Sequence, residues 1–322
     1  MQPRGTVPPA SWTIVMTSGI VSVDLGADHQ AVLSAVMFWF TAAVWVFLAV
    51  VLAAPLAYQR GRFAREAGAP VSLAAVAATA VLGTVLAIRD VRIAAAALLA
   101  LAVFGWVVLE VPVLRHWTTP TTGVSFLAGV ATDGLAVLSA TLAVSFRAGW
   151  LAGAAIVFLL LALALYVFTV ARFDLRQLVL GQGDHWVAGG ALAISALAAG
   201  KITQAAGVLG LLRAQHQVLS TGTLVLWCLA MAWLPVLIAG EIAARRLRYD
   251  IRRWGTVFPL GMYAACSFTA GQVTGIGGIT TFGRVWTWVA VAATVLALAG
   301  LGRSVYRARP RSGARAGQRA ES

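Results

Sequence analysis

Two charged residues lie inside long apolar stretches and are the first candidates for chemistry. Asp133 lies ten residues into an apolar segment at about 123–146, and Lys201 lies near the end of another at about 185–206. A carboxylate near the bilayer centre costs about 2.5 to 3.5 kcal/mol on insertion scales, so Asp133 is expected to face protein or water. Three roles are open to it: a proton carrier, a group that tunes the potential of a pore, or a hydrogen-bonded packing residue beside Thr132.

Lys201 and the remaining acidic side chains of the apolar segments lie closer to the expected helix ends. Lys201 either attracts an anion toward a pore or lets its ammonium group snorkel to the membrane surface. Asp24, Glu110 and Glu241 lie where water is within reach, so we expect solvated helix ends there.

The stretch Trp254–Tyr263, which reads WGTVFPLGMY, predicts a bent helix. Pro259 has no amide hydrogen, so the carbonyl of Gly255 loses its helical partner, and Gly255 and Gly261 flank the break. The bend turns Phe258 away from the regular helix face, where a bulky ring is placed to close a narrow tube. Ordinary packing is the other role open to this ring.

Motifs of enzymes and metal proteins are absent from the sequence. The four histidines show no HExxH or i,i+4 pairing, and no GxSxG, Walker A or GxGxxG sequence occurs. We therefore predict no metal site, no cofactor and no enzymatic activity. A membrane-embedded enzyme is kept as the last alternative.

The composition predicts an integral membrane protein. Of the 322 residues, 60% are hydrophobic and 11% are charged, with a mean hydropathy of +0.87. This is more apolar surface than one soluble domain hides, and ten spans of roughly 20 residues use up the chain. The net charge of +13 is assigned to membrane orientation and to anionic lipid headgroups, and nucleic acid is not an expected partner.

Charged and Pro/Gly-rich breaks divide the chain into ten apolar segments, and none shows the two-residue alternation of a barrel strand. We predict an all-α membrane domain at 11–302, a short N-terminal segment at 1–10, and a disordered basic tail at 303–322 that contacts anionic headgroups. The segments lie at about 11–27, 31–58, 71–88, 91–114, 123–146, 150–171, 185–206, 221–242, 254–273 and 281–302.

The placement of basic residues predicts the orientation. With both termini inside, eighteen arginines fall on the cytoplasmic side, and six basic residues, including Lys201, fall on the other. Cytoplasmic loops are enriched in Lys and Arg. We therefore expect a multi-pass protein of the plasma membrane with both termini in the cytoplasm.

Odd-numbered and even-numbered segments differ in composition, which predicts an inner and an outer ring of helices. Interior glycines gather in the odd segments, and hydroxyl side chains show the same bias more weakly. Glycine lets backbones approach or bend, and freed backbone groups are tolerated only beside protein or water. The predicted pore-lining residues are Gly19, Thr132, Asp133, Ser195 and Thr256.

Four segments taken together resemble the tellurite-resistance/dicarboxylate transporter family, whose relatives include the slow anion channels of plant guard cells. They are Pro9–Ile20, Phe126–Leu138, Asp184–Ser195 and Trp254–Tyr263, and the resemblance spans essentially all ten helices. One departure is Ala128, where the family commonly has proline.

The resemblance implies five helical hairpins around a central pore, with the odd helices inside, assembled as a homotrimer with one pore per subunit. It also implies that the phenylalanine of the fourth segment, Phe258, plugs the pore. The expected partners are small inorganic or carboxylate anions.

The leading prediction is a channel that passes small anions through a pore gated by Phe258. The alternative is a proton-coupled carrier of C4-dicarboxylates such as malate, or of tellurite, in which Asp133 titrates in each cycle. A dicarboxylate site is expected to need Arg or Lys at depth. The sequence places none between the helix ends, which favours the channel.

Overall fold

The computed structural model describes residues 8–58, 68–180, 183, 185–243 and 249–308. Ten long helices account for most of this part of the chain, and each matches a predicted segment within a few residues. They are α1 (Trp12–Ala27), α2 (Ala31–Tyr58), α4 (Ala74–Ile88), α5 (Arg92–Arg115), α6 (Leu127–Phe146), α7 (Gly149–Val170), α9 (Trp186–Leu209), α10 (His216–Ala243), α11 (Trp254–Thr274) and α12 (Gly277–Ala308). A short helix, α8, covers Gln177–Leu180.

Four inner helices begin with a single 3-10 turn. The turns are η1 (Pro9–Ser11), η2 (Pro70–Leu73), η3 (Gly123–Phe126) and η5 (Ile251–Arg253), and they lead into α1, α4, α6 and α11. Proline at the first position of η1 and η2 suits a helix start, because the amide hydrogen it lacks would have no partner there.

Within the described residues, nine helices are long and apolar enough to cross a membrane. The tenth long helix, α11, has 21 residues and carries no Asp, Glu, Lys or Arg. It differs from the other nine only in its lower mean hydropathy. Its side chains are nearly all buried against other helices, and such a helix needs no apolar face toward lipid. The chain is a multi-pass membrane protein with an all-helical fold.

Burial separates the helices into two sets. The most apolar stretches of α1, α4, α6 and α9 are 72 to 89% buried, whereas those of α2, α5, α7, α10 and α12 are 22 to 33% buried. The second set exposes large apolar side chains such as Phe47, Phe104 and Leu160, as expected of surfaces that contact lipid. With α11, the first set forms the inner helices.

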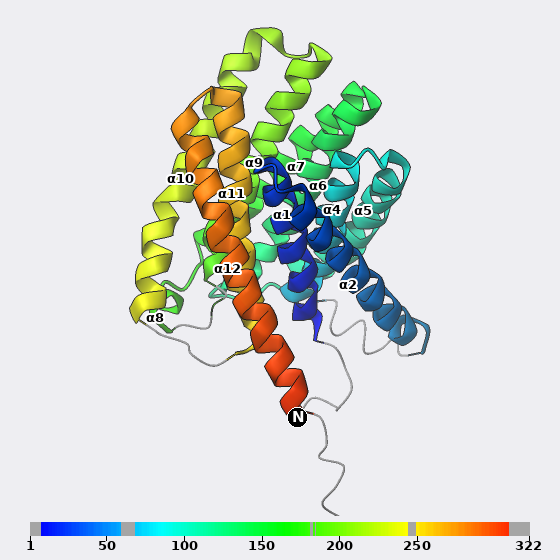
Figure 1. Ribbon diagram of the computed structural model, residues 1–322, viewed down its shortest axis with the longest axis vertical. Coiled ribbons are helices and arrows are strands. Elements are labelled where there is room, and N and C mark those ends of the chain that lie inside the picture. The colour runs from blue at the N-terminus through cyan, green and yellow to red at the C-terminus, as the bar shows by residue number, and fades with distance from the viewer. Residues whose placement is uncertain (1–7, 59–67, 181–182, 184, 244–248, 309–322) are drawn as a thin grey trace, which may run out of the picture.

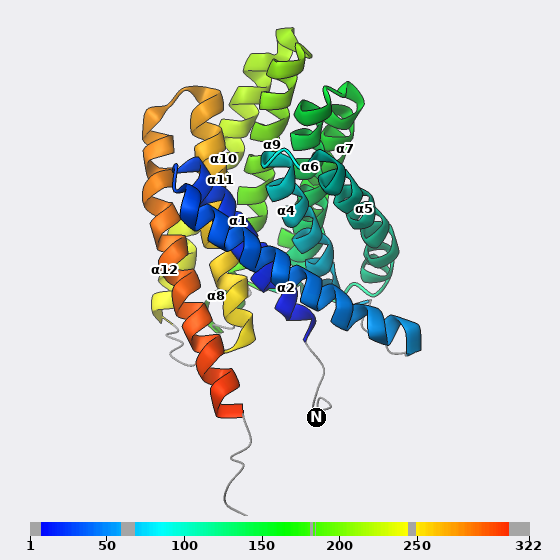
Figure 2. The same ribbon diagram turned by 45° about the vertical axis from the view of Figure 1, so that its right-hand side comes forward.

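The inner helices contact one another in a closed order: α1, α4, α6, α9, α11 and back to α1. Each inner helix also contacts the outer helix that follows it in the chain, namely α2, α5, α7, α10 or α12. Figures 1 and 2 show the outer helices lying around this inner set. A continuous pore through the ring stays a prediction.

Left-handed residues form the tight turns between inner and outer helices. His29, Asp90, Arg147 and Gly275 have φ between 52° and 72° where α1, α4, α6 and α11 end. Asp and Gly tolerate this region better than most residues, and such a residue ends a helix sharply. Each of these four inner helices therefore turns directly into its outer partner, and the turns lie at the same end of the bundle (Figures 1 and 2).

The start of α1 and the end of α12 lie at the other end of the bundle (Figures 1 and 2), which agrees with an even number of spans. Helix α12 continues to Ala308, so residues 303–308 of the segment predicted as a disordered tail are helical. The rest of that segment, 309–322, lies outside the described residues.

Candidate functional site

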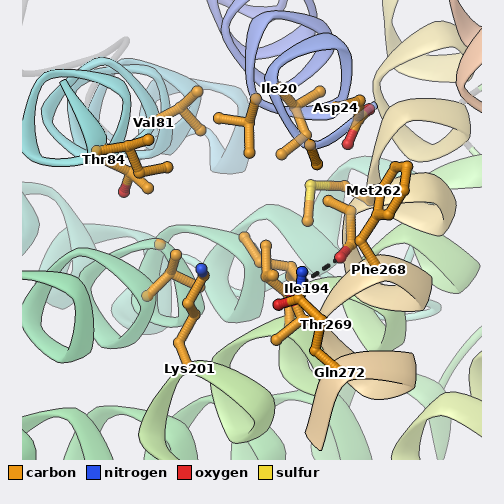
Figure 3. Close-up of a pocket in the computed structure, with 17 residues that line it drawn as sticks. Ile20, Asp24, Val81, Thr84, Ile194, Lys201, Met262, Phe268, Thr269 and Gln272 are labelled. Carbon is orange, nitrogen blue, oxygen red and sulfur yellow. Dashed lines mark hydrogen bonds between the residues drawn. The ribbon is translucent and has the colours of Figure 1, made fainter. Parts of the chain in front are cut away.

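A cavity lies where the C-terminal halves of the inner helices surround one another. It holds about 660 Å³ of space free of protein atoms, including the part open to solvent. All five inner helices line it, through residues that include Ile20, Asp24, Val81, Thr84, Gly134, Val137, Ile194, Lys201, Met262, Phe268, Thr269 and Gln272 (Figure 3). Most of these residues are apolar, and electrostatic interactions are strong in apolar surroundings. Each charged group in the lining therefore has a large effect on which ligands the cavity can bind.

Lys201 is the basic residue of this lining, and it is also the single lysine of the chain. Its ammonium donates to Gln204 Oε1 at 3.2 Å, and Gln204 Nε2 donates to Gln272 Oε1 at 2.9 Å. No carboxylate lies within ion-pair distance of it among the described residues. The expectation that no basic residue lies between the helix ends was wrong, because α9 continues to Leu209, two turns beyond Lys201.

Asp24 is the acidic residue of the same lining, and the prediction of a solvated helix end was wrong for it. Its side chain is fully buried, and neither carboxyl oxygen has a hydrogen-bond partner among the described residues. The sequence misled because α1 packs against α4 and α11 on the side where Asp24 projects. Glu110 on α5 is likewise buried, whereas Glu241 accepts a hydrogen bond from Arg253 at 2.8 Å.

One face of α11 connects the cavity to Phe258. Met262, Thr269 and Gln272 line the cavity, and Phe258 lies one helical turn before Met262 on that face. Gly255, one turn earlier still, is half-buried with open space where a side chain would begin. Phe258 itself is 1% exposed. The buried ring therefore lies between an open region at Gly255 and the cavity at Met262.

Two of the three residues predicted to bend α11, Pro259 and Gly261, are placed at close helix contacts. Pro259 lies inside the helix, which runs from Trp254 to Thr274. A Cβ at Gly190 of α9 would come within 2.8 Å of the Pro259 ring, and one at Gly261 would come within 3.4 Å of Asp24 Oδ2. Glycine at 190 therefore lets α9 approach α11 at Pro259, and glycine at 261 lets α1 approach α11 two residues later.

The predicted pore-lining residues do not contribute to this cavity, and Thr132 shows why. Its hydroxyl donates to Ala128 O at 2.8 Å and accepts the indole N–H of Trp106 on α5 at 2.9 Å. The indoles of Trp45 and Trp227 on outer helices make the same kind of bond to inner-helix hydroxyls. Hydroxyl side chains are frequent on the inner helices partly because they accept these hydrogen bonds from the outer helices. Composition alone does not distinguish this role from pore lining.

Asp133 and Ser195 are brought together between two inner helices. Ser195 Oγ donates to Asp133 Oδ2 at 2.6 Å, which joins α9 to α6, and both side chains are buried. Gly134 and Ile194, their neighbours in sequence, line the cavity. The pair therefore stands directly behind the cavity wall.

Asp133→Asn is expected to preserve anion flux. Asparagine keeps the shape of the side chain and an acceptor for Ser195 but does not titrate. The side chain at position 133 also lies outside the lining of the cavity. Asp133→Leu removes the link from α9 to α6, but the Ser195 hydroxyl keeps Ala191 O as an acceptor at 3.0 Å, so the expected cost is that of one hydrogen bond, about 1 kcal/mol. Thermal unfolding and flux in proteoliposomes check both variants. Flux lost in Asp133→Asn together with its pH dependence would instead support the carrier.

Gly19 and Thr256 are the remaining predicted pore-lining residues. A Cβ at Gly19 would come within 3.3 Å of Thr41 and closer still to Val81, so this glycine allows α1 to pack against α2 and α4. Thr256 is buried on α11, two residues before Phe258, and its hydroxyl has no hydrogen-bond partner among the described residues.

The start of α11 is fixed by charged residues outside the spans. Asp250 Oδ1 accepts the backbone N–H of Arg252 at 2.8 Å and caps the 3-10 turn η5 (Ile251–Arg253). Partial burial acts to raise the pKa of Asp250, but hydrogen bonds from Arg252 and the charges of Arg252 and Arg253 outweigh it and lower the pKa. Arg253 also bonds Glu241 at the end of α10. These contacts hold the helix end that leads to Phe258.

A family model described as voltage-dependent anion channel matches residues 6–301. The chain belongs to this family. The resemblance carried by four sequence segments is therefore confirmed over most of the chain. Members are channels and transporters of anions, not enzymes, and anions are accordingly the expected substrates.

Part of this chain is also similar to two curated proteins. They are uncharacterized membrane proteins of Mycobacterium tuberculosis, one from strain CDC 1551 and one from strain H37Rv. Each is 31% identical over 118 residues, which is 34% of this chain and 57% of the relative. The match thus spans little more than half of the relatives' length.

Proposed function

We propose that this protein is a channel that passes small anions along the axis of the inner helices and is closed by Phe258. The observation that carries the proposal is the face of α11 that runs from open space at Gly255, past a fully buried aromatic ring, to a cavity holding Lys201. A ring at a dry constriction excludes water and ions until it moves. Weak binding near one cation suits rapid conduction.

The alternative is a proton-coupled carrier of a C4-dicarboxylate or of tellurite. One observation favours coupling: a buried carboxyl, Asp24, lines the same cavity as Lys201. A dicarboxylate recognised through both of its carboxylates would be expected to need two cations. Among the described residues, the cavity lining includes a single cation, Lys201, which favours the channel.

Reversal potentials separate the two functions. The full chain in planar bilayers, under chloride, nitrate or malate gradients, is expected to give potentials that follow the monovalent anion gradient. A pH gradient alone should not generate a potential in a passive channel. A potential that follows the proton gradient in the presence of malate would instead establish the carrier.

Accessibility to water tests the proposed path. In a background with Cys228 and Cys266 replaced, cysteines at Thr84 and Thr269 should react with a water-soluble thiol reagent much faster than one at Leu101. Thr84 and Thr269 line the cavity, whereas Leu101 is on the exposed apolar face of α5. Equal labelling of all three sites would contradict an aqueous path inside the ring.

The assembly and orientation belong to the same proposal. We expect a homotrimer with one pore per subunit, in the plasma membrane with both termini in the cytoplasm. The arginine-rich segment after Ala308 then faces anionic headgroups of the inner leaflet. Cross-linking in native membranes tests the trimer, and protease access to the C-terminus of sealed vesicles tests the orientation.

A further inference from the structure

The cavity among the inner helices contains one cation and one carboxyl, and neither neutralises the other directly. Lys201 reaches the cavity from α9 and Asp24 from α1, and Figure 3 shows the two groups on different sides of the space. The ammonium is bonded to a neutral amide, and the carboxyl oxygens have no partner among the described residues. Lys201 is thus available to an anion that enters, and the buried Asp24 carboxyl has no hydrogen-bond donor among the described residues that would hold it in the ionised form.

The other groups around Asp24 do not supply the missing partner. Helices α2 and α4, which pack against α1, carry no Asp, Glu, Lys, Arg or His within their bounds. Helix α11, which also packs against α1, carries no Asp, Glu, Lys, Arg or His within its bounds; its titratable side chains are Tyr263 and Cys266. On α12, Arg284 faces Asp28 instead, at 3.8 Å. Lys201 is accordingly the cation that shares the cavity with Asp24.

An anion held at Lys201 repels a negative charge at Asp24, and most of the intervening wall is apolar, so this repulsion is poorly screened. Binding of the anion therefore favours binding of a proton to Asp24. Linkage is reciprocal, so a proton at Asp24 must raise the affinity of the cavity for the anion by the same factor.

We infer that this cavity binds one monovalent anion together with one proton, the anion at Lys201 and the proton at the Asp24 carboxyl. The inference rests on the proposed function, since it assumes that anions enter the cavity. It assigns the proton to Asp24 and leaves Asp133, which is bonded to Ser195 behind the wall, outside the linkage. It also sets the valence, because a single ammonium balances a single negative charge.

Nitrate binding to the purified full-length protein tests the inference. Nitrate replaces gluconate at constant ionic strength, and affinity is taken from the rise in thermal unfolding temperature. Between about pH 5.5 and about pH 8, the wild-type dissociation constant should increase about tenfold, within the usual range of coupling between sites. Asp24→Asn should flatten this dependence, whereas Asp28→Asn, which changes the residue just after the end of α1, should retain it. A pH-independent wild type, or an unchanged dependence in Asp24→Asn, would overturn the inference.

Proton uptake provides a measurement that does not depend on how the Asp24 variant folds. Adding nitrate to wild-type protein in weakly buffered solution with a pH indicator should take up as much as one proton per chain. Lys201→Gln should abolish the uptake at the same nitrate concentration. Nitrate binding without proton uptake across this pH range would refute the assignment. Flux in proteoliposomes is scored separately, so an absence of conduction counts against the channel and an absence of linkage counts against the Asp24 site.

Discussion

Phe258→Ala is expected to increase anion current at least about tenfold at equal amounts of protein in the membrane. The ring is buried between open space at Gly255 and the cavity at Met262, and alanine removes most of it. Water then fills the constriction and the dewetting barrier falls. A barrier lowered by about 1.4 kcal/mol already gives a tenfold rate. Single-channel and macroscopic currents in planar bilayers measure the change.

The matched control for this variant is Phe126→Ala. Phe126 is also 1% exposed, but its ring packs against Tyr166 and Phe173 at centroid distances of 5.4 Å, away from the cavity lining. Phe268 is unsuitable because it lines the cavity. Each buried Phe→Ala change costs about 3 to 5 kcal/mol of stability, so both variants are checked by size-exclusion chromatography. An intact Phe258→Ala protein with parental current would show that the ring only packs.

The positions of the helices could be predicted from the sequence because each one extends for the full thickness of a bilayer. An apolar run of about 20 residues leaves no alternative to a helix, and charged or glycine-rich turns mark its ends. The division into inner and outer helices could also be predicted from the composition of each segment, because helices that face lipid carry almost only apolar side chains on that face. Phe104 and Leu160 on outer helices and Gly190 on an inner helix illustrate that difference.

Side-chain direction could not be predicted, and it decides which residues meet at the cavity. Thr132 and Asp133 are adjacent in sequence, yet one is bonded to an outer helix and the other to a neighbouring inner helix. Asp24 near a helix end looked solvated, but the packing of α11 covers it. The rotation of each helix about its axis follows from contacts between helices, which a single sequence does not state. The signal that pointed to Phe258 was its position next to Pro259 in the stretch Trp254–Tyr263, and its role in closing a pore stays a prediction.

Lys201→Gln is expected to reduce anion conductance about tenfold at low ionic strength. Lys201 is the basic residue of the cavity lining and has no carboxylate partner among the described residues. Its removal leaves an entering anion without a compensating charge in mostly apolar surroundings. The loss of about 1.4 kcal/mol of attraction corresponds to a tenfold weaker occupancy. Conductance measured against chloride concentration reports this change directly.

Two further variants separate a charge in the cavity from a charge at the surface. Lys201→Arg keeps the cation and should restore most of the conductance, whereas Arg213→Gln removes an exposed charge at the same end of the bundle and should change it little. An effect of a surface charge disappears when salt shortens the screening length to about 3 Å at 1 M. The Lys201→Gln deficit should persist there, because the lysine lies within the cavity wall. Equal losses in Lys201→Gln and Arg213→Gln, both abolished by salt, would place the effect at the surface and remove Lys201 from the anion path.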